Sequence, residues 1–205
     1  MTLFPAFLKL DGRPVLVVGG GRIACGKIPG LLEAGARVTV VAPKLSPKLV
    51  EWVRDREIEW LPKPFEGEDL LGMFLVIAAT SLLDVNESVF READRRRVLC
   101  NAVDDIDHCH FYYGAVVQRG NLQIAISTNG KSPALAQRLR KELEEQYTPD
   151  YAAWLEWLGA AREVLHTQAN DPETTKRWLH LLASRPMFER FLLETHLATP
   201  EGGVS

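Results

Sequence analysis

Short apolar runs alternate with longer amphipathic segments along the first half of the chain. The runs Pro14–Val18, Val38–Val41 and Phe74–Ala79 are rich in β-branched residues, as is typical of strands that are covered on both faces. Two further short runs, Glu57–Leu61 and Val98–Val103, also read as strands. The segments between these runs favour helices. The pattern therefore predicts an α/β fold with a Rossmann-type, doubly wound parallel sheet.

A glycine-rich turn follows the first predicted strand and opens a predicted helix. Gly19, Gly21 and Ala24 have the spacing G-x-G-x-x-A. In such a motif Gly19 allows the tight turn, Gly21 lets the backbone approach a pyrophosphate, and Ala24 lets the helix pack closely on the sheet. The free N–H groups at the start of the helix favour phosphates. This context predicts a dinucleotide site; the alternative is a turn that only permits close packing.

The second predicted strand lacks the acidic residue that usually binds the ribose of NAD. The chain continues there as Val41-Ala42-Pro43-Lys44. A carboxylate therefore does not dictate the choice of NAD, and Lys44 is compatible with a 2′-phosphate.

Polar residues follow the fourth and fifth predicted strands. Sheets of this kind bind ligands beyond the carboxyl ends of their strands, so Thr80 and Asp104 are expected on the same edge as the glycine turn. Asp104 is the best candidate for a general base in the cleft. A turn or a helix cap is the common alternative for aspartate, and Asp105 and Asp107 compete for the same role.

The pattern changes after residue 111. Two β-rich runs joined by Gln118–Asn121 predict a hairpin, and three further helices are expected between residues 151 and 196. Ser46 and Ser132 each precede a proline and are expected to cap helices. Because a hairpin with one helix buries little of its own surface, a homodimer is expected to form through it. The expected domains are a Rossmann domain at 1–112, a dimerisation segment at 113–148 and a helical domain at 149–205.

Composition and cysteine usage narrow the class of protein. The chain has 205 residues and a net charge of −3, which gives no sign of a nucleic-acid or membrane partner. Its three scattered cysteines favour free thiols and a cytoplasmic protein. His108-Cys109-His110 suggests a metal site, but further ligands are missing, so no metal is expected. Lys131 and Arg138 form a basic stretch that is either a solvated face or a contact for an anionic substrate.

Several separated motifs carry a family resemblance. They are LFPAFLKLDGRPVLVVGGGRIACGKIPGLLEAGARVTVVAP, VIAAT, CNAVDD and ISTNGKSPALAQRLRKELE, which together cover about residues 3–146. This combination resembles the precorrin-2 dehydrogenase family, which includes free-standing enzymes and the N-terminal module of siroheme synthase. The resemblance implies NAD-dependent oxidation of precorrin-2 to sirohydrochlorin, on the way to sirohaem or cobalamin. It also implies a homodimer.

The resemblance assigns roles to individual positions. Those implied for the cofactor are Gly21, Arg22 and Ile23 at the pyrophosphate, Pro43 and Lys44 near the adenosine ribose, and Thr80 near the nicotinamide. Asp104 matches the aspartate proposed as the general base, and Ser132 borders the substrate cleft. Lys131 and Arg138 are then expected to attract the acidic tetrapyrrole. The chain departs from the family pattern at Gly114, Thr128 and Lys131, which leaves the detailed substrate contacts open.

Two other functions remain open at this stage. The protein could be a sirohydrochlorin metal chelatase, alone or in addition, with Asp104 or the pair His108 and His110 handling protons or metal. It could also be a non-catalytic NAD-sensing module whose basic helix contacts a partner. The residues alone do not distinguish these functions, nor NAD from NADP.

Overall fold

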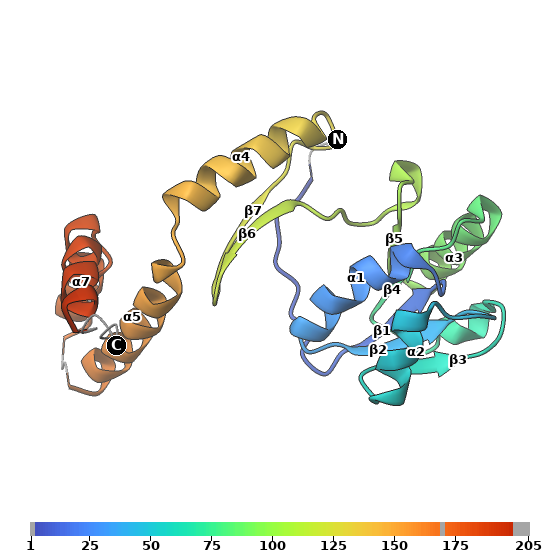
Figure 1. The fold of residues 1–205 in the computed structure, drawn as a ribbon, viewed down its shortest axis with the longest axis horizontal. Coiled ribbons are helices and arrows are strands. Elements are labelled where there is room, and N and C mark those ends of the chain that lie inside the picture. Colours follow the sequence, from blue (N-terminus) through green and yellow to red (C-terminus); the bar gives the residue numbers. More distant parts are fainter. Residues whose placement is uncertain (1–2, 169–170, 199–205) are drawn as a thin grey trace, which may run out of the picture. The chain divides into compact units, whose positions relative to one another are not determined.

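The computed structural model describes residues 3–168 and 171–198, and the chain divides into two compact units (Figure 1). One unit is Phe4–Tyr113, and the other contains the remaining residues. The first unit is an α/β layer structure. The second consists of a β-hairpin followed by helices.

Five parallel strands form the sheet of the first unit. They are β1 (Pro14–Val18), β2 (Arg37–Val41), β3 (Glu59–Leu61), β4 (Leu75–Ala78) and β5 (Leu99–Ala102). Their order is β3-β2-β1-β4-β5, so the strand order reverses between β1 and β4. The last residues of all five strands pair in one row across the sheet: Leu61, Val41, Val18, Ala78 and Ala102. The loops that follow the strands therefore begin at a common edge.

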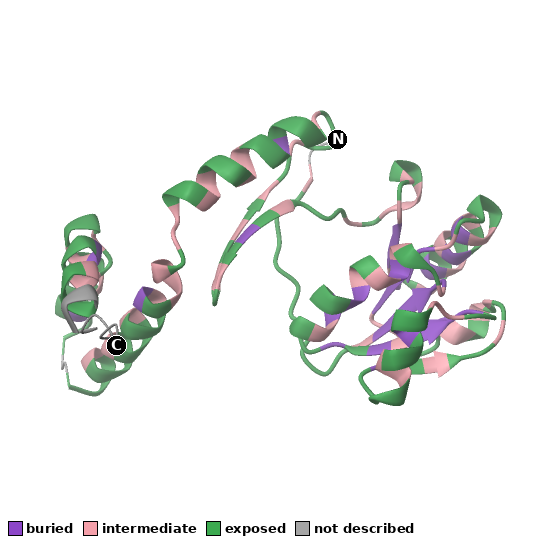
Figure 2. Cartoon of the chain, in the orientation of Figure 1, coloured by how far each residue is buried: buried purple, intermediate pink, exposed green. Residues whose placement is uncertain are grey.

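Helices cover both faces of this sheet. One face packs against α1 (Arg22–Glu33) and α2 (Pro47–Arg54), and the other against α3 (Leu83–Arg96) and the short 3-10 helix η1 (Gly67–Leu70). Val17 of β1 points to the first face and Leu16 to the second, and both side chains are 0% exposed. Figure 2 shows the buried residues gathered in these strands. Burial on both sides explains the continuous apolar runs, and the predicted doubly wound sheet is confirmed.

The second unit begins with a hairpin and one helix. Strands β6 (Ala115–Arg119) and β7 (Leu122–Ile126) are antiparallel and are followed by α4 (Pro133–Gln146). Ser132 caps α4, because its hydroxyl accepts a hydrogen bond from the Leu135 N–H at 3.2 Å. Within residues 115–146, all of which are described, the buried hydrophobic residues are Val117 and Ala136. The hairpin and α4 therefore have a very small core.

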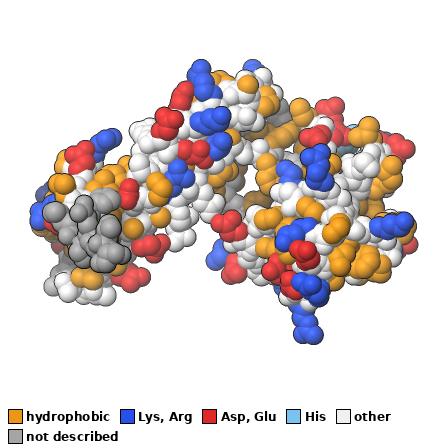
Figure 3. Space-filling model, viewed as in Figure 1, with side chains coloured by type: hydrophobic (Ala, Val, Ile, Leu, Met, Phe, Trp, Pro, Cys, Tyr) orange, Lys and Arg blue, Asp and Glu red, His pale blue; other side chains and the backbone are white. Residues whose placement is uncertain are grey.

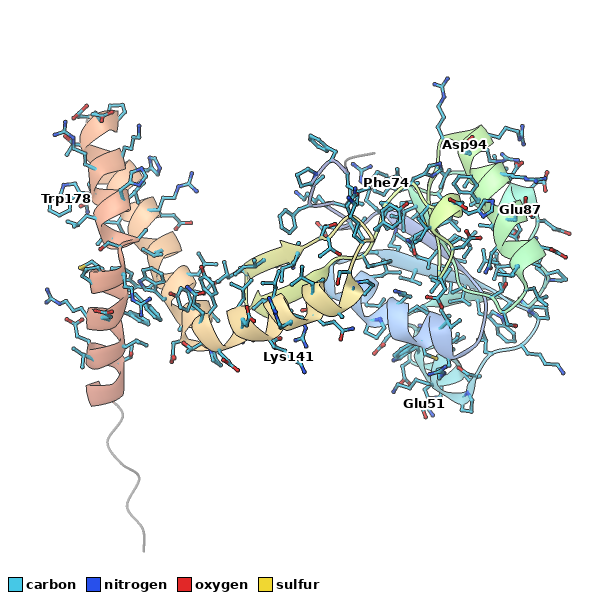
Figure 4. The ribbon with its side chains drawn as sticks, turned by 90° about the horizontal axis from the view of Figure 1, so that it is seen from above. Glu51, Phe74, Glu87, Asp94, Lys141 and Trp178 are labelled. Atoms are coloured by element: carbon cyan, nitrogen blue, oxygen red, sulfur yellow. The ribbon has the colours of Figure 1, made fainter. Side chains whose placement is uncertain are left out.

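Three helices complete the described chain: α5 (Asp150–Gln168), α6 (Pro172–Leu182) and α7 (Arg185–Ala198). Trp154 and Tyr151 of α5 pack on Phe188 of α7, with ring centroids 4.8 and 4.2 Å from the phenylalanine. Trp178 is instead 51% exposed and projects from α6 (Figure 4). Among the residues that the structure describes, no helix combines the length and apolar character needed to cross a membrane.

Candidate dinucleotide and substrate site

The loop after β1 is tightly constrained by its neighbours. Gly19 has a φ of +124°, and a Cβ at this position would lie 2.5 Å from the Ala79 carbonyl oxygen. At Gly20 a Cβ would lie 2.0 Å from the carbonyl oxygen of Lys44. Both positions therefore exclude a side chain. The need for Gly19 was predicted, whereas the need for Gly20 was missed because it occupies a variable position of the motif.

The start of α1 is open and uncapped. A Cβ at Gly21 would meet no atom within 4 Å, and this N-cap residue supplies no side-chain hydrogen bond. The first turn of α1 contains no acidic residue, so its N–H groups keep their partial positive charge. Ala24 is 0% exposed and packs against the sheet, while the side chain of Arg22 is exposed and that of Ile23 is half-buried. The backbone at this helix start fits a diphosphate.

The loop after β2 lies against the glycine loop. The Ser46 N–H donates to the Gly20 carbonyl at 2.8 Å, and Pro43 and Lys44 are exposed. Ser46 is the N-cap residue of α2 and Pro47 begins the helix, as predicted. The Ser46 side chain makes no cap hydrogen bond, however, and its Oγ lies 3.1 Å from the Cys25 Sγ on α1. No carboxylate occurs in residues 42–46.

The loop after β4 is held by a buried asparagine. The Asn86 side chain on α3 is 1% exposed, and its Oδ1 lies 2.7 Å from the Thr80 Oγ1. Its Nδ2 donates to the Thr80 carbonyl at 3.1 Å, and its Oδ1 also accepts from the Thr80 N–H at 3.2 Å. Asn86 therefore fixes both the backbone and the side chain of Thr80. No pattern in the sequence marks this residue.

The two adjacent aspartates in the turn after β5 have different surroundings. Asp104 is exposed, has a φ of +62°, and makes no hydrogen bond or ion pair with any described residue. The carboxylate of Asp105 is half-buried and lies 2.7 Å from the Nδ1 of His108. Asp107 is exposed in the following 3-10 helix η2 (Ile106–His108). Asp104 is thus the carboxylate directly after the strand that remains available to a ligand.

Both histidines that follow β5 have structural contacts. The Nδ1 of His110 accepts a hydrogen bond from the Cys100 N–H at 3.0 Å, which leaves the ring proton on Nε2, 3.2 Å from Asp94 of α3 (Figure 4). The Phe90 ring packs on the rings of His108 and His110, with centroids 5.1 and 4.9 Å apart. In the described part of the chain, no three His, Cys, Asp or Glu side chains are grouped to hold a metal ion.

The segment in which the sequence departs from the family pattern has its own contacts. The Lys27 Nζ of α1 lies 4.2 Å from the centre of the Tyr113 ring, and burial raises the pKa of the Tyr113 phenol to about 12. At Gly114 a Cβ would lie 2.9 Å from the carbonyl oxygen of Ile126 in the adjacent strand. The glycine is therefore accounted for by close packing within the hairpin.

The residues expected to meet the substrate lie in the second unit, at the start of α4. Lys131 is exposed in the turn before the helix, and Ser132 is half-buried. The Arg138 guanidinium pairs with Glu142 at 3.1 Å, so its charge is partly balanced. Figure 3 shows acidic and basic side chains interspersed along α4. Of these three residues, Lys131 offers an exposed cation without a carboxylate partner in the described chain.

The switch in strand order beside an open, glycine-lined helix start defines the first unit as a Rossmann-type NAD(P)-binding domain. Residues 6–115 match the family model described as "Putative NAD(P)-binding". Residues 119–146 match the model of the central domain of sirohaem biosynthesis proteins. The chain belongs to the family formed by the N-terminal, NAD-binding and central part of siroheme synthases and by their free-standing relatives.

Individual relatives show how far the similarity extends. The chain is 40% identical over 185 residues to siroheme synthase 3 of Aeromonas hydrophila, and 38% identical over 196 residues to the siroheme synthase of Actinobacillus pleuropneumoniae. These alignments cover 90% and 96% of the chain but only 40% of each relative. The chain thus spans about 40% of the length of these synthases.

One solved structure matches over nearly the whole chain. It is described as "SirC, precorrin-2 dehydrogenase", and it is 31% identical to the chain with a TM-score of 0.77. The match covers 94% of the chain and 98% of SirC. The similarity therefore includes the hairpin and the C-terminal helices as well as the Rossmann-type sheet.

Proposed function

We propose that the protein is an NAD-dependent precorrin-2 dehydrogenase that produces sirohydrochlorin for sirohaem or cobalamin biosynthesis. The observation that carries this proposal is the similarity to SirC, which at 31% identity extends over 98% of that dehydrogenase. The matching fold alone would not indicate a reaction, because many chemistries share the Rossmann-type sheet. Sequence similarity over the whole length of a dehydrogenase indicates the reaction much more specifically than the fold does.

The cofactor is assigned to the edge where the five strands end. The open, uncapped helix start at Gly21 and the backbone N–H groups of Arg22 and Ile23 in the first turn suit the pyrophosphate, with Gly19 and Ala24 shaping the loop. Pro43 and Lys44 would lie at the adenosine ribose. Thr80, which is held in place by Asn86, would lie at the nicotinamide. When bound, NAD supplies the hydride acceptor of the reaction.

Asp104 is proposed as the general base. Oxidation of a carbon–hydrogen bond by NAD removes a hydride and releases one proton, which requires an acceptor. The exposed, unpaired carboxylate of Asp104 can take this proton, while the carboxylate of Asp105 is engaged by His108. This contrast favours Asp104 over its neighbour.

The substrate and the assembly are assigned to the second unit. Precorrin-2 is an acidic tetrapyrrole, so the exposed ammonium of Lys131 suits its carboxylates, with Ser132 and Arg138 on the same turn and helix. The small core of the hairpin and α4 supports a homodimer through residues 113–148, between a cofactor domain at 1–112 and a helical domain at 149–205. The free thiols of Cys25, Cys100 and Cys109 support a cytoplasmic location.

A spectrophotometric assay tests the reaction and the base together. The wild-type protein should reduce NAD in the presence of precorrin-2, and an assay with NADP should show whether Lys44 admits that cofactor. Asp104→Ala should lower kcat by roughly 10²–10⁴-fold, the range for a general base, while NAD still binds. Asp105→Ala is the matched control and should retain most of the activity. Equal losses in the two variants would contradict the assignment of Asp104.

Metal insertion is the second candidate function, because the relatives are siroheme synthases and sirohaem contains iron. In that case Asp104 would accept protons from the pyrrole nitrogens of sirohydrochlorin. The same assay, repeated with sirohydrochlorin and ferrous or cobalt ions but without NAD, measures this activity. Tight NAD binding with neither activity would indicate a cofactor-sensing module instead.

A further inference from the structure

A cleft of about 690 Å³ lies between α5 and α6 in the second compact unit. Its basic lining residues are Arg162 and His166 of α5 and Lys176 and His180 of α6. No carboxylate is among the described residues that line it. This concentration of basic groups is a local departure, because the chain as a whole has a net charge of −3.

The basic groups of the cleft have no acidic partners within the described chain. Arg162 donates instead to the Nε2 of His166, at 3.4 Å, so one basic group faces another. On α7, by contrast, Arg185 pairs with Glu189 at 3.1 Å and Arg190 pairs with Glu194 at 2.8 Å. Arg162 and Lys176 are cations that line the same cleft without a carboxylate partner, so an anion bound between them relieves their mutual repulsion.

The cleft also has an apolar part. Leu179 is half-buried there, and Pro172 lies at the start of α6. The volume is within the range of roughly 300–1,000 Å³ that is usual for small-molecule sites, which combine apolar walls with a few polar groups. Six of the eight lining residues are exposed, so the cleft is an open groove that admits a large organic anion with one face against Leu179.

We propose that this cleft is a second binding site for the acidic tetrapyrrole, distinct in its residues from the strand ends and from the start of α4, to which the reaction is assigned. Arg162 and Lys176 pair with carboxylates at the rim of the tetrapyrrole, and Leu179 contacts its ring system. The identity of the anion rests on the proposed dehydrogenase function, whereas the positive charge of the cleft does not. Such a site would hold substrate or product while the catalytic edge is occupied.

The test is a fluorescence titration of the full chain with uroporphyrin, a stable polycarboxylated tetrapyrrole, at low salt. The wild-type protein should show two classes of site. Arg162→Gln together with Lys176→Gln should weaken one class about tenfold, as expected for the loss of two solvent-accessible charge pairs, and the kcat for precorrin-2 should stay unchanged. Arg177→Gln is the matched control, because Arg177 lies on α6 outside the cleft lining and should change binding less than twofold.

Three outcomes would overturn the proposal. The first is equal affinity of the cleft variants and Arg177→Gln for uroporphyrin. The second is a single class of site in the wild-type protein. The third is equally tight binding of benzenehexacarboxylate, which would show that the cleft recognises carboxylates without the ring. A wild-type protein that binds uroporphyrin in the cleft but never oxidises precorrin-2 would instead refute the proposed function.

Discussion

The two compact units are built around cores of very different size. In the first, both faces of the sheet are covered, and residues such as Leu16, Val17 and Ile77 are 0% exposed. In the hairpin and α4 of the second, Val117 and Ala136 are the buried hydrophobic residues. Burial of apolar surface is the main favourable contribution to folding, so we expect the first unit to fold without a partner. The proposed dimer would cover apolar side chains that the hairpin and α4 leave exposed, such as Val116 and Leu135.

Removing a core side chain from the first unit should have the largest effect on stability. Leu16→Ala deletes a fully buried side chain and should lower the free energy of unfolding by about 2–5 kcal/mol. Urea denaturation measures this change. The loss should be the same at all protein concentrations if the sheet folds independently of the dimer. If the loss in unfolding free energy depends on protein concentration, the stability of the sheet is coupled to dimerisation.

A substitution in the glycine loop should separate folding from cofactor binding. Gly20→Ala places a methyl group where the Lys44 carbonyl oxygen lies, so it should destabilise the protein by about 1–3 kcal/mol. Gly21→Ala meets no neighbouring atom and should leave the stability nearly unchanged while raising the KM for NAD. Thermal denaturation and steady-state kinetics check the two variants. Normal NAD binding by Gly21→Ala would argue against a phosphate at this position.

A charge on the exposed apolar face of α4 should break the proposed dimer. Leu135 is 39% exposed, and Leu135→Asp would place a carboxylate in the proposed contact between the two copies of the chain. Aspartate in the first helical turn favours the helix by about 0.3–1 kcal/mol, so a loss of dimer would not result from unfolding of α4. Sedimentation velocity should show a dimer for the wild-type protein and a monomer for the variant. A monomeric wild-type protein would refute the dimer.

The smallest predicted effect concerns the reactivity of the cysteine thiols. All three cysteines lie within Phe4–Tyr113, so their reactivity reports on the first unit alone. Burial raises the pKa of the Cys100 thiol to about 12, so very little reactive thiolate is present near neutral pH. Cys100 should react with a disulfide reagent at pH 8 only when the sheet unfolds. Peptide mapping of the labelled protein identifies the site, and Cys25, which is half-buried, serves as the internal comparison.

Much of the fold could be predicted because its signals are local. The apolar strand runs, the glycine spacing and the Ser132 cap each depend on residues that are neighbours in the sequence. The contacts that hold the strand-end edge in place are not local: Gly20 meets Lys44, and Asn86 of α3 holds Thr80. No spacing rule marks such pairs. The same holds for Ser46, whose hydroxyl contacts Cys25 rather than its own helix.

In the second unit, the contacts of exposed side chains could not be predicted from the sequence, for a different reason. Exposed residues such as Trp178 carry no pattern that distinguishes a solvated face from a contact with another molecule. The basic groups of α5 and α6 are separated along the chain and come together only when the two helices pack. The sequence alone therefore does not show that they line one cleft. In the first unit, the sequence ranked Asp104 first but left Asp105 and Asp107 in competition. The difference between the free carboxylate of Asp104 and the paired carboxylate of Asp105 depends on His108.

The contact between Gly20 and Lys44 has a consequence for how cofactor choice can change over time. The main-chain carbonyl oxygen of Lys44 lies where a Cβ at Gly20 would be, while the Lys44 side chain is exposed. Since a peptide carbonyl is common to all residues, this close approach does not depend on the side chain at position 44. A lysine codon becomes a glutamate codon by a single nucleotide change. If Lys44 lies at the adenosine ribose as proposed, a lineage can exchange an ammonium for a carboxylate there, and so alternate between cofactors, with little effect on the glycine loop.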